Sequence, residues 1–245
     1  MEAQVNQVIE KAILDLYHRG EEVKPLKWQS VEVEQPMLEV TQRFYQMRMP
    51  GSSKVLQSQC RADQPWAEDH FQERVSGEPL NPGNQYYNWP YYSHGKDDDR
   101  FREGDKQFSH SYMERYWPPK DLKGIRYNYG DLNNLVDRIK SDPLTRQAYL
   151  AVWYPEDQVD IGERVPCTLG YHFLIRNNRL DCTYFIRSCD ARRHFKNDIY
   201  MTIRLAQWVV KKLQFTDLKV GNLNMWVGSL HCWAIEKPML KWGRV

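Results

Sequence analysis

Four short segments carry residue types that can do chemistry together, and they follow one another in the second half of the chain. The second segment offers a cysteine thiol, a nucleophile when ionised. The third offers a guanidinium beside a hydroxyl, which suits a terminal phosphate. Taken singly, a cysteine that opens a strand is more typical of a buried apolar residue, and each arginine of a surface ion pair. The segments are DPLTRQAYLAVWYPED (142–157), RVPCTLGYHFLIR (164–176), IRSCDARRHFKNDIY (186–200) and VGSLHCW (227–233).

In combination, these segments resemble the thymidylate synthase family. That family has a DPxSRR block before a strand ending in Trp, a Pro-Cys pair that opens a strand, an RSxD block with a helix beginning eleven residues after its arginine, and a SLH-type block. The resemblance covers roughly residues 131–235, and four blocks in the right order rarely coincide by chance. It implies an enzyme that transfers a one-carbon group.

The resemblance assigns the nucleophile to Cys167, which follows Pro166. Its thiolate would add to C6 of a pyrimidine nucleotide, a soft conjugate acceptor, and make C5 an enamine-like nucleophile. Since a free thiol is mostly protonated at neutral pH, we expect neighbouring arginines to favour the thiolate. Tyr112 in SHSYMERYWP is similar to the tyrosine of the family's VYGxQWR segment. Glu68 in WAEDHF is similar to the family's catalytic glutamate, with a solvated helical glutamate as an equal alternative.

The same resemblance implies where the phosphate binds. Arg187 and Ser188 match the family's phosphate-binding arginine and serine. Arg146 matches the first of two adjacent arginines that reach the phosphate from the other subunit, so the resemblance implies a homodimer with shared active sites. The second of these arginines is Gln147 here, and one cation is therefore missing.

Asp190 matches the aspartate whose backbone faces the pyrimidine O2 and whose carboxylate binds the folate pterin, and Trp89 is a second predicted folate contact. The implied cosubstrate is 5,10-methylenetetrahydrofolate, and no metal is expected. His231 matches the histidine that contacts the sugar 3′-hydroxyl. Trp233 stands where the family has Tyr, and an indole N–H donates but cannot accept. We therefore expect altered sugar recognition, with ribose and deoxyribose both open.

One side chain in the family distinguishes uracil from cytosine. It lies eleven residues after the RSxD arginine and is Asn in thymidylate synthases, whereas here it is Asp198. Cytosine N3 accepts and its N4 donates, and a protonated aspartic acid meets both with its O–H and C=O. The acid also places a proton where negative charge develops as sulfur adds. Two alternatives remain: Asp198 is only a helix N-cap, or a slip of one residue places Asn197 at this position.

The segment FKNDxY thus resembles the deoxycytidylate (dCMP) hydroxymethyltransferases of the family. In that subgroup water adds to an exocyclic methylene at C5, and the cysteine is then expelled. The rival activities are CMP 5-hydroxymethylase, dCMP methyltransferase and thymidylate synthase. A non-catalytic member that binds a nucleotide or RNA is the alternative from another class. A role in making modified phage DNA precursors is implied by the resemblance alone.

Composition limits the partners. A net charge of +2 argues against a broad surface for duplex nucleic acid. No run of 18 apolar residues occurs, so no membrane span is expected. The five cysteines form no CxxC pair, which favours a reducing compartment. We therefore predict a cytoplasmic protein, in the host cytoplasm if it is phage-encoded.

These residues need a scaffold, and the sequence predicts an α+β fold with a mixed β-sheet and packed helices. We expect one catalytic domain over 1–245, in which 76–120 is a long ordered loop or insertion. Residues 21–60 mix short β-prone stretches. The predicted helices lie at 5–16, within 62–75, at 132–139 and at 199–213, and the predicted strands at 148–154, 167–175, 180–187 and within 220–233.

Overall fold

The chain folds around one six-stranded mixed sheet. The computed structural model describes residues 3–28, 31–32, 34–91, 108, 110–118, 131–158, 165–241 and 243. The strand order is β1-β4-β8-β7-β6-β5. β7 and β8 pair in parallel, and the other neighbours are antiparallel. The strands are β1 (Glu21–Val23), β4 (Met37–Arg48), β5 (Tyr149–Ala151), β6 (Thr168–Arg176), β7 (Arg179–Asp190) and β8 (Lys219–Trp233). A separate two-stranded ribbon joins β2 (Lys27–Trp28) and β3 (Val31–Glu32).

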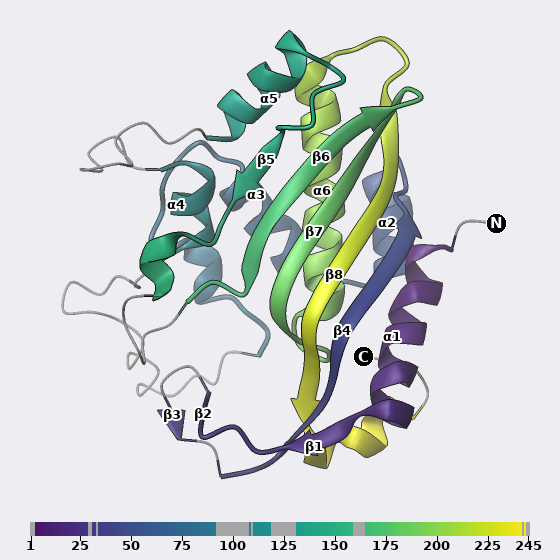
Figure 1. Ribbon diagram of the computed structural model, residues 1–245, viewed down its shortest axis with the longest axis vertical. Helices are drawn as coiled ribbons and strands as arrows, with labels where there is room; N and C mark the ends of the chain where they lie inside the picture. The colour runs from purple at the N-terminus through teal and green to yellow at the C-terminus, as the bar shows by residue number, and fades with distance from the viewer. Residues whose placement is uncertain are drawn as a thin grey trace.

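Helices cover one face of this sheet. The long helix α6 lies behind β7 and β8 in Figure 1, and α1 runs along the β4 side. The α-helices are α1 (Val5–Arg19), α2 (Ser53–Cys60), α3 (Trp66–Arg74), α4 (Tyr112–Tyr116), α5 (Leu132–Ser141) and α6 (Phe195–Leu213). The short 3₁₀ helices are η1 (Asn84–Tyr86), η4 (Pro155–Gln158) and η5 (Ala234–Leu240).

The core lies between α6 and the sheet. Along β7 every second residue is buried, from Leu180 to Ile186, as expected when one face of a strand packs against helices. In the view of Figure 1 no described helix lies over the opposite face of β6, β7 and β8. The sheet is therefore covered on one side only by the described part of the chain.

The turn between β6 and β7 follows directly from its sequence. Asn177 and Asn178 both have positive φ angles, 50° and 56°. A two-residue hairpin turn of the twist-matched type needs positive φ at both positions, which asparagine tolerates better than most residues. The hairpin predicted between residues 167 and 187 is therefore confirmed, and it positions the segment before β6 beside the end of β7.

The predicted α+β fold with a mixed sheet is confirmed, with differences in its elements. The mixed stretch 21–60 contains a twelve-residue strand, β4, and a helix, α2, that the sequence pattern did not reveal. Within 76–120 the described residues carry η1 and α4, while 92–107, 109 and 119–120 lie outside the described residues. The loop or insertion assigned to 76–120, and the limits of the domain, stay predictions. In the described chain, no helix is both long and apolar enough to cross a bilayer.

Candidate active site

Cys167 lies at the entrance to β6, half-buried, on a segment that Arg187 holds in place. The backbone N–H of Arg187 donates to the Cys167 carbonyl over 2.9 Å. The side chain of Arg187 donates from Nε to the Pro166 carbonyl at 2.9 Å and from Nη2 to the Val165 carbonyl at 3.1 Å. Its guanidinium carbon is 5.6 Å from the centre of the Trp153 ring. A cation is thus fixed on the segment that carries Cys167, and a positive charge close to a thiol favours the thiolate.

Tyr112, at the start of α4, lies beside the same segment. Its hydroxyl oxygen accepts from the backbone N–H and from the hydroxyl of Thr168, both at 3.4 Å. Burial and, to a smaller extent, negative charge on Cys167 raise the pKa of Tyr112 to about 12. Tyr112 therefore stays protonated at neutral pH and can donate a hydrogen bond into the site. The structure brings together Cys167 and Tyr112, which the sequence had paired only by resemblance.

Asp198 joins this cluster from the first turn of α6. The thiol of Cys189 donates to Asp198 Oδ2 over 3.6 Å. Burial raises the pKa of Asp198, while the positive charges of His194 and Arg74 and the Cys189 hydrogen bond act in the opposite direction. Asp198 does not cap the helix, because the N-cap residue of α6 is His194. The helix-cap alternative for Asp198 is therefore wrong.

The neighbouring Asn197 is occupied elsewhere. Its side chain is fully buried and makes three hydrogen bonds. It accepts from the backbone N–H of Asp63 at 2.9 Å, and donates to Asp63 Oδ2 at 2.9 Å and to the Arg193 carbonyl at 3.0 Å. An amide that already uses its oxygen and nitrogen in this way has little capacity left for a ligand.

Arg74, in the last turn of α3, is a member of the site that the sequence did not indicate. Its side chain is buried, and its guanidinium carbon lies 4.3 Å from the centre of the Tyr112 ring. Nε and Nη2 lie 3.2 and 3.1 Å from His70 Nε2. Because a guanidinium only donates, His70 Nε2 must accept, so His70 is neutral. Burial lowers the pKa of His70 to about 4, in agreement with that state.

The cation of Arg74 is kept charged by surrounding oxygens. Burial disfavours the charge, but the nearby oxygens outweigh it and raise the pKa of Arg74. They belong to Tyr116, Tyr171, Tyr112 and Asp198. An arginine near a helix end would ordinarily be read as compensating the helix dipole. Only the packing of α3 against α4 and α6 shows that it faces the site.

The predicted folate aspartate, Asp190, is bound by the chain itself. Its Oδ1 accepts from the backbone N–H groups of Arg192 and Arg193, both at 2.9 Å, and its Oδ2 accepts from Arg193 Nη1 at 2.9 Å. Buried Glu236 of η5 holds the other side of Arg193 through contacts of 2.6 and 3.1 Å, and it also binds Arg192 Nη1 at 2.7 Å. Three hydrogen bonds from the chain thus occupy the Asp190 carboxylate, and a pterin would compete with Arg193 for Oδ2.

Trp89, the other predicted folate contact, stacks on His194. The two rings lie 4.9 Å apart at an angle of 15°. The indole Nε1 of Trp89 is buried, and no hydrogen-bond partner for it exists among the described residues. A buried donor of this kind suits a bound acceptor. Trp89 therefore keeps a buried donor that a ligand could use, whereas a ligand at Asp190 would compete with Arg193.

The parallel pairing of β7 and β8 brings the predicted sugar residues to the phosphate residues. Ser188 lies opposite Ser229, and Asp190 lies opposite His231. His231 is buried, and burial lowers its pKa. The backbone N–H of Trp233 donates to Glu236 Oε2 at 3.1 Å, which ties the end of β8 to η5.

Two predicted residues lie apart from this cluster. Both carboxylate oxygens of Glu68 are bound by Arg204, with Tyr200 adding a hydrogen bond at 2.7 Å. Burial opposes ionisation of Glu68, but the hydrogen bonds from Arg204, Tyr200 and Gln72 together with the charge of Arg204 outweigh it, and the pKa of Glu68 is lowered. Arg146 is exposed before β5, and its carbonyl pairs with His172 Nε2 at 3.0 Å. The catalytic role of Glu68 and the phosphate role of Arg146 stay predictions.

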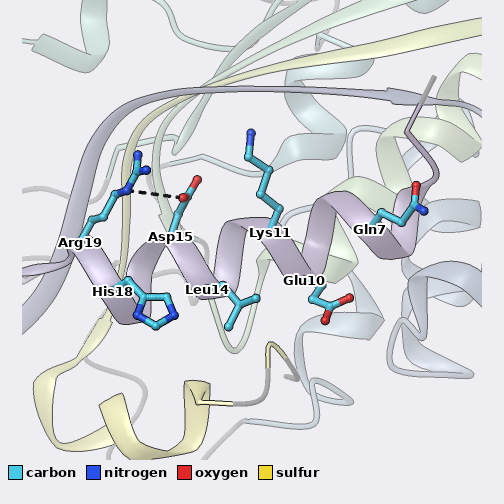
Figure 2. Close-up of a pocket in the computed structure, with 7 residues that line it drawn as sticks. All are labelled: Gln7, Glu10, Lys11, Leu14, Asp15, His18 and Arg19. Atoms are coloured by element: carbon cyan, nitrogen blue, oxygen red, sulfur yellow. Dashed lines mark ion pairs between the residues drawn. The ribbon is translucent and has the colours of Figure 1, made fainter. Parts of the chain in front are cut away.

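Two hollows of the surface do not coincide with the cluster. One, of about 480 Å³, follows α1. Its lining residues all project from that helix, and Asp15 and Arg19, one helical turn apart, form an ion pair (Figure 2). The other, of about 380 Å³, lies between α5 and β5. Within the residues that the structure describes, no three His, Cys, Asp or Glu side chains are grouped to hold a metal ion.

The geometry can be compared with known proteins. The family model described as thymidylate synthase matches residues 83–240. A protein of Methanocaldococcus jannaschii described as "Putative thymidylate synthase" is 30% identical over 112 residues, which are 43% of this chain and 48% of that protein. The chain thus spans about half the length of that curated relative. The solved structure of thermostable thymidylate synthase A from Bacillus subtilis superposes with a TM-score of 0.71 at 14% identity, covering 98% of this chain and 84% of that one.

The family match extends over more than half of the chain, and the superposition shows that the fold is the same. The chain belongs to the thymidylate synthase family.

Proposed function

We propose that this chain transfers a one-carbon unit to C5 of a cytidine monophosphate, most simply dCMP, and releases a 5-hydroxymethyl product. The observation that carries the proposal is Asp198, a carboxyl group in the same cluster as Cys167 and Tyr112 whose pKa is raised by burial. A neutral carboxylic acid offers one donor and one acceptor side by side. That pattern complements N3 and the N4 amino group of cytosine.

The surroundings of Asp198 support this choice of base. Asn197, the amide that would suit uracil, is taken up by Asp63 and the Arg193 carbonyl. The thiol of Cys189 donates to Asp198 Oδ2, so this oxygen already accepts one hydrogen bond from the protein. In this proposal, the base binds to the donor and acceptor positions of the carboxyl group that Cys189 does not occupy.

The residues divide the work as follows. The Cys167 thiolate adds to C6, and Asp198 donates its proton to N3 as negative charge spreads over the ring. C5 becomes the nucleophile for the one-carbon unit, which 5,10-methylenetetrahydrofolate supplies when bound. Tyr112 donates a hydrogen bond beside the thiol. C5 loses its hydrogen as a proton when the folate departs, and water then adds to the exocyclic methylene at C5 to give the hydroxymethyl group. N3 returns its proton to Asp198 as the Cys167 thiolate leaves C6, and the product is released.

The phosphate and the second subunit are parts of the same proposal. Arg187 uses Nε and Nη2 to hold the Cys167 segment, which leaves Nη1 to reach a phosphate beside Ser188. Across the uncovered face of the sheet, Phe44 lies opposite Trp226, and Trp226 opposite Phe185. Phe44 is 57% exposed. An exposed row of aromatic residues is typical of a protein interface, and we propose that a second copy covers it.

A dimer of this kind would allow the exposed Arg146 to reach the partner's phosphate site. Mixing Arg146→Ala with Cys167→Ser should then restore part of the activity that each variant lacks, because a hybrid dimer regains one complete site. Phe44→Glu should give a monomer by light scattering. Full activity in a monomer would contradict the shared site.

The decisive experiment measures exchange of the C5 hydrogen in CMP, dCMP, UMP and dUMP without folate, because exchange needs only the C6 adduct. We expect the cytosine nucleotides to exchange faster, and Asp198→Asn to reverse the order. The matched control is Asp137→Asn on the exposed face of α5, which should change nothing. Addition of 5,10-methylenetetrahydrofolate, with products identified by mass, then separates hydroxymethyl from methyl transfer.

The alternative from another class is a non-catalytic member that binds a nucleotide or RNA. It predicts that a pyrimidine nucleotide binds while its C5 hydrogen never exchanges in wild type. Equal exchange of dUMP and dCMP would instead leave a catalytic protein and reject Asp198 as the residue that reads the base.

A further inference from the structure

A carboxylate, a hydroxyl and an imidazole form a chain across β4 and β8, beside the predicted sugar site. In the antiparallel register Glu39 lies directly opposite His231, and Thr41 lies opposite Ser229. The hydroxyl of Ser229 donates to Glu39 Oε1 in a short hydrogen bond. The same hydroxyl oxygen lies 3.3 Å from His231 Nδ1. Neither Glu39 nor Ser229 belongs to the proposed catalytic set.

The direction of each hydrogen bond follows from the chemistry of its groups. A carboxylate only accepts, so the single hydrogen of the Ser229 hydroxyl points to Glu39. Toward His231 the Ser229 oxygen can then only accept. Nδ1 must therefore carry the hydrogen. A neutral imidazole has one donor and one acceptor nitrogen, so Nε2 is the acceptor.

We infer that Glu39, acting through Ser229, fixes neutral His231 in the tautomer that carries its hydrogen on Nδ1, so that Nε2 accepts a hydroxyl hydrogen from the sugar of the nucleotide. The sugar contact rests on the proposed function, whereas the tautomer rests on the hydrogen-bond geometry alone. Glu39 and Ser229 are positioning residues, because they act on the ligand through His231.

The charges around His231 fit a neutral ring. Glu39 faces it from β4, Asp190 from the end of β7, and His194 from the turn that follows. The two carboxylates favour the charged ring, but burial opposes it more strongly, and the pKa of His231 is lowered. At neutral pH the ring is therefore uncharged, and its tautomer decides whether it donates or accepts.

The tautomer of His231 is important because the neighbouring predicted sugar contact, Trp233, can only donate. An indole N–H donates and offers no lone pair in its plane. A sugar hydroxyl cannot donate to the indole N–H of Trp233, whereas it can donate to His231 Nε2 in the inferred tautomer. The Glu39 relay thus sets one half of the hydrogen-bond pattern that the pocket presents to the sugar.

The first test measures the tautomer directly, by NMR of protein labelled with ¹⁵N-histidine and without any ligand. His231→Gln assigns the signals. Wild type should show the neutral ring protonated on Nδ1. In Glu39→Gln the amide can donate to Ser229, which frees the serine hydrogen to point at Nδ1, and the tautomer should invert. Ser229→Ala should give a mixture of both forms. A wild-type ring protonated on Nε2 would overturn the inference.

The matched control is Gln46→Glu, which replaces an amide by a carboxylate and is therefore the reverse of Glu39→Gln. Gln46 Nε2 donates to Asn224 Oδ1 at 2.7 Å across the same pair of strands, away from His231. Gln46→Glu should leave the tautomer of His231 unchanged. It shows whether a change in the pairing of β4 with β8 is enough to move the NMR signals of the histidine. If Glu39→Gln does not fold, the wild-type and Ser229→Ala spectra still decide the tautomer.

The second test compares the binding of dCMP with that of 2′,3′-dideoxycytidine monophosphate, which lacks the 3′-hydroxyl. Wild type should bind the dideoxy compound about tenfold more weakly, since the acceptor of His231 loses its partner. In Glu39→Gln that ratio should fall, because the inverted ring could still donate to the 3′-oxygen but would no longer accept the hydroxyl hydrogen. An unchanged ratio in Glu39→Gln would overturn the sugar contact. If no pyrimidine nucleotide binds, the proposed function fails, while the tautomer measured by NMR stands or falls by itself.

Discussion

Two aspartates at the two ends of one short turn have opposite environments. Asp190 ends β7 with two backbone N–H groups and Arg193 on its oxygens. Asp198 lies in the first turn of α6 with a thiol as its hydrogen-bond donor, and burial raises its pKa. The same side chain is thus held by three N–H donors of the chain at one end of the turn, and is a group poised to keep its proton at the other. The difference comes from the donors that each fold position supplies.

The largest effect is expected from Cys167→Ser. A serine hydroxyl is far less ionised than a thiol, so the C6 adduct should not form and C5 exchange should fall below detection. Nucleotide binding and thermal unfolding should stay close to wild type, because the side chains are nearly the same size. If the serine variant exchanged the C5 hydrogen at a rate comparable to wild type, Cys167 would not be the nucleophile. The proposed donation of a proton from Asp198 to the activated ring would then lose its basis.

The comparison of the two aspartates is tested most directly by Asp198→Asn. Its NH2 group would face the N4 amino group of cytosine, donor against donor, at a cost of about 1–3 kcal/mol, which is roughly a tenfold to hundredfold loss. The rate of C5 exchange in dCMP measures this loss. Wild-type exchange should also fall as pH rises through the raised pKa of Asp198, because only the neutral acid donates to N3. In Asp198→Asn that decline should vanish.

Arg74→Met sharpens the account of Asp198. The cation of Arg74 opposes the rise in the pKa of Asp198. Its removal should raise that pKa further, and the decline of activity at high pH should begin at a higher pH. Arg115→Met is the control, because Arg115 is also buried but pairs with Asp157 at 2.7 Å. A shift of the pH profile in both variants, or in neither, would contradict the role given to Arg74.

The smallest effect is expected at the other aspartate. Arg193→Ala should free Oδ2 of Asp190 and tighten the binding of 5,10-methylenetetrahydrofolate. Partly exposed ion pairs contribute about 0.5–1 kcal/mol, so the dissociation constant should fall about two- to fivefold. Arg192→Ala is the matched control, since its side chain contacts Glu236 and not Asp190. Weaker binding in Arg193→Ala would mean that Arg193 itself holds the ligand.

The sequence predicted the elements that have strong periodicity. α1 buries the same face that its apolar spacing indicated, from Val5 to Leu16, and the asparagine turn defined the β6–β7 hairpin. β4 was missed because its burial alternation breaks in the middle, around Gln42, where φ is positive. A break of this kind removes the period-two signal on which a strand prediction depends.

The site was predictable only where residues are neighbours in a motif. Cys167, Arg187, Asp190 and Asp198 were all indicated by short segments in the second half of the chain. Arg74 reaches the site through the packing of its helix. Glu39 reaches it through strand register, which pairs it with His231 more than a hundred residues later in the sequence. Spacing along the chain carries no signal for such contacts. The same limit explains why the ion pair between Glu68 and Arg204 was not foreseen.

The parallel pairing of β7 and β8 also has a consequence for how the protein folds. Residues of the pocket come from the ends of both strands, and α6 and its flanking turns separate those strands along the chain. Closing such a long connection is slow compared with forming the β6–β7 hairpin. A nascent chain can therefore hold Cys167 and Arg187 in place and still lack His231. Because only the complete sheet would bind a nucleotide, that ligand should protect the whole sheet against unfolding and not merely the loops around it.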